Sequence, residues 1–209
     1  MRIGSSNKIT RFKGNIVLKL FINSSHFFEC FLVHHYQDLI NIFNDCFALQ
    51  YNTQLVKGDD EPIYLPADEQ RAYHALCFAH GFFSSALHEC SHWLIAGKAR
   101  RQQVDFGYWY IPDGRSTEQQ ARFQLVEVKP QAMEWVLSVA TGHRFRVSVD
   151  NLNGEEANND PFKDAVYQQV LNYCQQGLPE RAKAFRQALC AFYATSSELI
   201  TEDFKREFL

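Results

Sequence analysis

Two histidines and a glutamate at residues 88–92 form the pattern His-Glu-x-x-His. Residues four apart on an α-helix lie one turn apart on the same face, so the imidazoles of His88 and His92 can point at one metal ion. Glu89 projects to one side of that pair, where a zinc peptidase keeps its general base. Apolar residues recur at helical spacing around the pattern, which predicts a metal-binding helix over residues 84–96. Two hydrogen-bonded histidines beside a core are the alternative without a metal.

A third ligand is expected from a carboxylate farther along the chain. Glu127 stands in an apolar neighbourhood, and a carboxylate is costly to bury unless it is paired or bound to a metal. We therefore expect Glu127 to complete a set of two histidines and one carboxylate. Glu134 is the competing ligand, and an ion pair of Glu127 with Lys129 or an arginine is the explanation that needs no metal.

Two imidazoles and one carboxylate suit either of two metals. With zinc, a bound water and Glu89 as the base, such a site hydrolyses an amide. With Fe(II), the same ligands leave positions open for dioxygen and suit an oxygenase. The spacing alone favours the peptidase. A third hypothesis is a non-enzymatic domain with a structural metal, which would show a closed shell of four ligands.

The elements that must position these residues follow from hydrophobic periodicity. Together they predict an α+β fold in a single domain, with helices packed around a small mixed or antiparallel sheet. Short extended runs are expected at 53–57 and 63–65, and a buried strand at 72–80 that ends at His80, which we interpret as structural. Helices are expected at 34–49, at 131–140, from Asp160 to near Gly177, and from Pro179 onward. A further helix is expected to begin at a capping box of Thr117 and Gln120 and to break at Pro130.

A strand rich in aromatic residues is expected at 104–111, after the motif helix. Asp105, Tyr108 and Trp109 lie in this strand and are candidates for the wall of a pocket, whereas a core strand with Asp105 bonded to backbone is the alternative. Before it comes a basic patch that includes Arg100 and Arg101. These arginines either complement the dipole of the helix end or meet an acidic partner surface.

Composition limits the class of protein. The 209 residues are 46% hydrophobic and fit one globular domain, which we place at 34–195. We expect residues 1–33 to be a poorly ordered extension and 196–209 to be a loosely packed tail. The net charge of −3 indicates no nucleic-acid or membrane partner. The six cysteines lack paired spacing, which predicts reduced thiols and a cytoplasmic location.

Several longer blocks of the sequence resemble the bacterial elongation factor P hydroxylase family. They include GDDEPIYLPA at 58–67, HECSHW at 88–93, VDFGYWY at 104–110 and VEVKPQA at 126–132. Further blocks lie at 78–82, 95–101 and 112–115. The resemblance covers about residues 34 to 193 and excludes the N-terminal extension. Cys90 stands where the family pattern has an apolar residue, and we expect it to face the core.

The resemblance implies that 34–195 is a metal-dependent hydroxylase domain. It implies a monooxygenase that uses Fe(II) and dioxygen on a lysine of elongation factor P already extended by a β-lysyl group. His88 and His92 match the family's metal ligands and Glu127 matches its carboxylate. Neither the residues nor the resemblance indicates a 2-oxoglutarate site. We expect a monomer.

The implied substrate gives the remaining candidates a role. A β-lysyl-lysine arm is cationic, so we expect Asp105, Tyr108 and Trp109 to bind it, with Asp105 and Glu89 as the candidate catalytic residues. Arg100 and Arg101 are expected to meet an acidic surface of elongation factor P.

Overall fold

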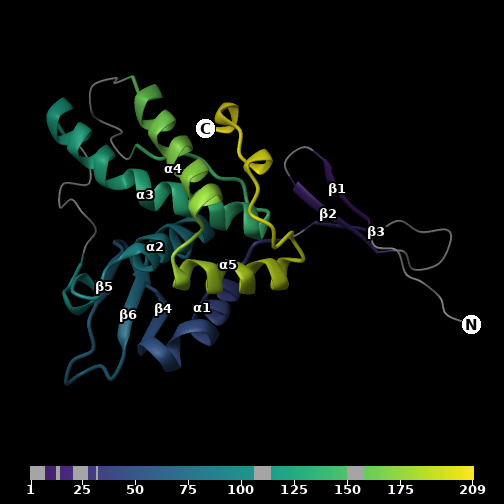
Figure 1. Ribbon diagram of the computed structural model, residues 1–209. Coiled ribbons are helices and arrows are strands. Elements are labelled where there is room, and N and C mark those ends of the chain that lie inside the picture. Colours follow the sequence, from purple (N-terminus) through teal and green to yellow (C-terminus); the bar gives the residue numbers. More distant parts are fainter. Residues whose placement is uncertain (1–7, 13–14, 21–27, 32, 106–113, 150–157) are drawn as a thin grey trace, which may run out of the picture.

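The computed structural model describes residues 8–12, 15–20, 28–31, 33–105, 114–149 and 158–209 (Figure 1). The helices are α1 (Tyr36–Tyr51), α2 (Phe83–Ile95), α3 (Thr117–Thr141), α4 (Asp160–Gln176) and α5 (Glu180–Tyr193), with short 3-10 turns η1 (Arg100–Gln102), η2 (Thr201–Asp203) and η3 (Arg206–Phe208). The strands are β1 (Lys8–Phe12), β2 (Asn15–Leu20), β3 (Phe28–Phe31), β4 (Thr53–Lys57), β5 (Ile63–Leu65) and β6 (His74–Phe78). The predicted fold class, helices packed around a small mixed sheet, is confirmed.

The sheet beside the motif helix has the order β4-β6-β5. β4 runs parallel to β6, and β5 runs antiparallel to it. Leu55, Leu76 and Phe78 of this sheet are buried. The bounds of β4 and β5 are those predicted from the sequence, and β6 lies within the predicted strand. The sheet therefore supplies one apolar surface on which α2 packs.

α2 carries the His-Glu-x-x-His motif and lies between this sheet and α3 (Figure 1). Its apolar side chains are buried in the common core, and Cys90 is among them, as predicted. α1 and α5 also contact α2. Because the core covers one side of α2, the opposite side is turned toward α3, where His88 and His92 lie.

α3 corrects the prediction that Pro130 breaks a helix. The helix runs without interruption through Pro130, and every residue from Pro130 to Leu137 is buried. Proline removes one backbone N–H bond, and the burial of this segment outweighs that loss. The capping box is also one residue earlier than predicted, with Ser116 as the N-cap and Gln119 as its partner.

The C-terminal residues correct the expectation of a loosely packed tail. Phe204 is only 2% exposed, and its ring meets Trp135 edge-on at a centroid distance of 5.3 Å. Arg206 pairs with Asp160 and Asp164 of α4. Leu199 and Leu209 also pack against the core, so the residues after α5 extend it.

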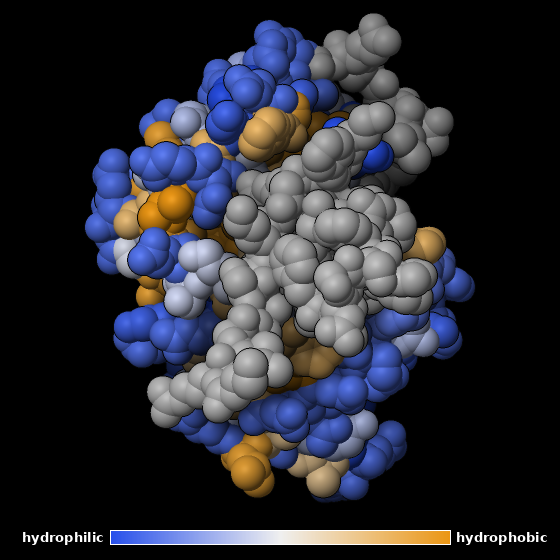
Figure 2. Space-filling view, turned by 90° about the vertical axis from the view of Figure 1, so that its right-hand side faces the viewer, coloured by the Kyte–Doolittle hydropathy of each residue, from blue (hydrophilic) through white to orange (hydrophobic). Residues whose placement is uncertain are grey.

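The N-terminal segment was expected to be poorly ordered. Within 1–33 the structure describes β1, β2 and β3, which form a second, antiparallel sheet that the sequence analysis did not anticipate. The predicted domain boundaries at 34 and 195 stay a prediction. On the face in Figure 2 the described surface is mostly hydrophilic, with small separate hydrophobic areas. No helix among the described residues is long and apolar enough to span a membrane.

Candidate metal centre

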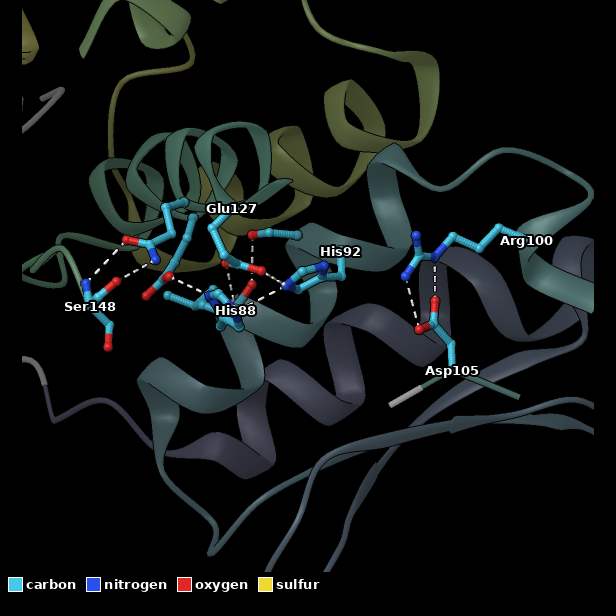
Figure 3. A network of polar contacts seen from close by, with 10 residues as sticks. His88, His92, Arg100, Asp105, Glu127 and Ser148 are labelled. Atoms are coloured by element: carbon cyan, nitrogen blue, oxygen red, sulfur yellow. Dashed lines mark hydrogen bonds and ion pairs between the residues drawn. The ribbon is translucent and has the colours of Figure 1, made fainter. Parts of the chain in front are cut away.

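Three side chains from two helices meet where α2 packs on α3. His88 and His92 come from consecutive turns of α2, and Glu127 comes from α3 (Figure 3). Each offers one ligand atom, and these atoms all lie within 4.8 Å of one another. Glu127 is 3% exposed, so its carboxylate is held inside the protein and directed at the imidazoles.

The distances within this group fit a bound cation. The two Nε2 atoms are 3.0 Å apart, His92 Nε2 lies 3.3 Å from Glu127 Oε1, and His88 Nε2 lies 3.5 Å from Glu127 Oε2. With metal–nitrogen bonds of about 2.0–2.1 Å, ligand atoms lie roughly 2.8–3.4 Å apart at octahedral or tetrahedral angles. The buried Oε2 of Glu127 also has no hydrogen-bond partner among the described residues, so it is free to bind a metal.

Glu134 contacts the other nitrogen of His88. Its Oε2 lies 2.9 Å from His88 Nδ1. A carboxylate there accepts the Nδ1–H bond and so leaves the lone pair of a neutral imidazole on Nε2, which faces His92 and Glu127. The structure therefore places Glu134, the competing ligand of the sequence analysis, where it orients a ligand instead.

The charged groups of the cluster shift one another's pKa values. Burial acts to raise the pKa of Glu127, but the charges of His92 and His88 outweigh it and lower the pKa to about 2. Burial acts to lower the pKa of His88, but the hydrogen bond to Glu134 and the charge of Glu127 raise it to about 10. At neutral pH the metal-free cluster thus holds a proton on His88. A metal ion must displace that proton, since imidazole binds metals in its neutral form.

Gln131 holds the chain after α3 close to this centre and was missed by the sequence analysis. Its amide donates to Ser148 O at 2.7 Å and accepts from Ser148 N at 3.1 Å (Figure 3). Glu127 lies one turn earlier on α3, and Gln131 contributes to the lowered pKa of that carboxyl group. The spacing of four between Glu127 and Gln131 was the signal that the two share a face.

The predicted substrate-binding residues are described only in part. Asp105 is held by two bonds from Arg100, one of them 2.9 Å long from Nη2, in a pair separate from the histidine cluster (Figure 3). Arg101 donates to Ala96 O at 2.6 Å. Tyr108 and Trp109 lie outside the described residues. The role of these five side chains in substrate binding stays a prediction.

Glu89 and His80 complete the account of the predicted residues. Glu89 is half-buried on α2, next to the cluster, and is not part of the group of three ligands. His80 lies outside that group as well, half exposed in the turn before α2 with its ring 3.9 Å from Asp60. Among the described residues, the centre therefore offers three protein ligands, the number typical of a site that keeps positions open for chemistry.

The chain is similar to a known protein family and to a curated relative. A family model described as "Elongation factor P hydroxylase" matches residues 42–204. A curated protein of Haemophilus influenzae named "Elongation factor P lysine hydroxylase" is 58% identical over 166 residues, which cover 79% of this chain and 93% of that protein. The residues matched by the family model include every member of the three-ligand group.

Proposed function

Because the chain belongs to the elongation factor P hydroxylase family, we propose that it hydroxylates the β-lysylated lysine of elongation factor P. The observation that carries the proposal is the convergence of His88, His92 and Glu127 on one point between α2 and α3. We propose that this group binds Fe(II), because two imidazoles and one carboxylate form the facial set that iron oxygenases use.

Bound iron would supply the activation of dioxygen, whose one atom enters a C–H bond of the substrate while the other leaves as water, with two electrons and two protons from a reductant. The residues of the chain do the rest. His88 and His92 hold the ion from one helix, and Glu127 fixes it from the other. Glu134 keeps the His88 ring in the orientation that presents Nε2.

Two further parts of the proposal concern the protein as a whole. We propose that it acts as a monomer in the cytoplasm. The cysteines whose side chains are described, Cys46, Cys77, Cys90, Cys174 and Cys190, are all free thiols. Reduced thiols are usual in a reducing compartment.

The test is mass spectrometry of β-lysylated elongation factor P after incubation with the protein, Fe(II), a reductant and air. We expect a gain equal to one oxygen atom. The gain should vanish with His88→Ala and persist with His35→Ala, a matched change at an exposed histidine.

The main alternative is a zinc peptidase with Glu89 as the base. Two results together would favour the peptidase over the hydroxylase. They are no gain of oxygen on elongation factor P with the unmodified enzyme, and cleavage of a peptide library by its zinc-loaded form.

A further inference from the structure

Glu89 differs from the other two glutamates of the metal centre in its contacts. Glu127 lies against both imidazoles, and Glu134 accepts a hydrogen bond from His88. The carboxylate of Glu89 makes no hydrogen bond and no ion pair with any residue the structure describes, although its side chain is half-buried. The oxygens of Glu89 are not among the buried atoms that lack a hydrogen-bond partner, so a ligand that enters from solvent can reach them.

The position of Glu89 is beside the ligands. It follows His88 in sequence and so projects about 100° further around α2. Burial raises the pKa of Glu89, the charges of His88 and His92 act to lower it, and those of Glu127 and Glu134 act to raise it further. Burial, and to a lesser extent the charge of Glu89, raises the pKa of the Cys77 thiol in β6. Glu89 therefore lies beside the metal centre, on the face of α2 next to the one that carries His88 and His92.

Among the described residues, the carboxylates at the metal centre carry more negative charge than a divalent ion can neutralise. Three carboxylates, those of Glu89, Glu127 and Glu134, surround two imidazoles that are neutral when they bind a metal. A divalent ion neutralises two of these three charges and leaves one negative charge over. Among the residues that the structure describes, no lysine or arginine makes a hydrogen bond or an ion pair with any of these three carboxylates.

Asp105, the carboxylate first considered for a cationic substrate, already has a cation. Arg100 holds both of its oxygens. Glu89 is thus the better placed acid for an incoming positive charge. Hydroxylation of a C–H bond also requires no base that acts on water, so the role that a peptidase gives this glutamate is not needed here.

We propose that Glu89 binds an ammonium group of the substrate's cationic arm beside the metal ion, so that the enzyme selects a charged amine over its neutral, acylated form. This inference rests on the proposed function and adds to it a residue that determines specificity. The ammonium group compensates the charge of Glu89 and places the neighbouring carbon atoms of the arm close to the ion.

The experiment compares two substrates, β-lysylated elongation factor P with free amines and the same protein after N-acetylation of the arm. We expect the unmodified enzyme to prefer the charged substrate by at least about tenfold in kcat/KM. In Glu89→Gln the preference should fall toward one while the bound metal stays at full occupancy. Glu89→Asp, which keeps the charge, should retain part of the preference, and the exposed Glu118→Gln should retain all of it.

Three results would overturn the inference. They are an unmodified enzyme with no preference for the charged substrate, a metal-loaded Glu89→Gln with the full preference, and a Glu89→Gln that no longer binds metal. The last would make Glu89 part of the metal site itself.

A second measurement separates this inference from the proposed function. Failure of the function shows as no oxygen gain on elongation factor P with any variant. In that case cadaverine, a simple diamine, is titrated into the Co(II)-loaded protein and followed by the visible absorption of the ion. Cadaverine binding that is at least about tenfold weaker in Glu89→Gln than in the unmodified enzyme supports the ammonium site. Equal affinity of the two proteins, or no binding to the unmodified enzyme, overturns it.

Discussion

His88 meets a carboxylate through each of its ring nitrogens. Nδ1 contacts Glu134 at 2.9 Å, and Nε2 faces Glu127 at 3.5 Å. The first contact fixes the rotation and the tautomer of the ring, so the second nitrogen is directed at the ion before the ion arrives. Preorganisation of this kind reduces the cost of binding, because no ligand has to be reoriented.

Replacement of Glu134 by glutamine tests this role. The amide oxygen of the new side chain can still accept the Nδ1–H bond, but the negative charge that raises the basicity of the ring is lost. We expect metal affinity to fall by about 10- to 100-fold, as measured by competition with a chelator of known affinity. Glu118→Gln on the same helix is the control. Equal affinity in both variants would show that Glu134 does not support the ligand.

The residue types explain which parts of the centre could be predicted. His88 and His92 followed from helical spacing, and Glu127 from the cost of burying a carboxylate. The division of roles between Glu127 and Glu134 could not be predicted, because the two lie on one face of α3, two turns apart. Which of them reaches Nε2 depends on how α3 crosses α2. That is a property of tertiary packing and leaves no local pattern.

At the scale of elements, the C-terminal end of α2 is held by two arginines. Arg181 of α5 donates to the carbonyls of Trp93, Leu94 and Ala96 at 2.6–3.1 Å. Arg101 donates to Ala96 O as well. The last carbonyls of a helix lack partners within the helix and carry a partial negative charge. The two guanidinium groups therefore fix the turn of α2 that follows His92.

We expect Arg181→Met to destabilise the protein by about 2 kcal/mol, because several helix carbonyls lose a charged donor. For a chain of this length that corresponds to a decrease in Tm of roughly 5 °C. Thermal unfolding of the metal-free protein measures it. The exposed Arg122→Met is the control, and an equal Tm in both variants would contradict the expectation.

The local sequence pattern predicted where helices and strands occur, but not that one helix continues through Pro130. β4 and β5 were predicted to the residue. Gly58 marks the end of β4, and Pro62 marks the start of β5. The single helix α3 was predicted as two, because Pro130 is a strong local signal against a helix. The burial of this part of α3 overrides that signal and depends on α2, α4 and α5 packing around it.

At the scale of the whole molecule, the C-terminal residues pack more closely on the core than the sequence suggests. The C-terminal residues return to α3 and α4, where Phe204 enters the core beside Trp135. The few apolar residues after α5 do not form a helical or strand-like stripe, so the sequence does not indicate that Phe204 enters the core.

Truncation of Phe204 to alanine should therefore cost about 3 kcal/mol of unfolding free energy, since it leaves a cavity beside Trp135. Urea denaturation measures this cost. Phe208→Ala is the matched control, because Phe208 is 53% exposed and its loss should change stability little. Equal stabilities of the two variants would mean that the tail does not contribute to the core.

The ligands of the metal centre come from α2 and α3, which η1 and a long connection separate in the chain. An ion held by both helices is a reversible cross-link that closes this connection into a loop. It lowers the entropy of the unfolded chain only while it stays bound, and it stabilises the folded state in proportion to the logarithm of metal concentration. We therefore expect the supply of the proposed ion to affect the lifetime of the protein against proteases as well as its proposed activity.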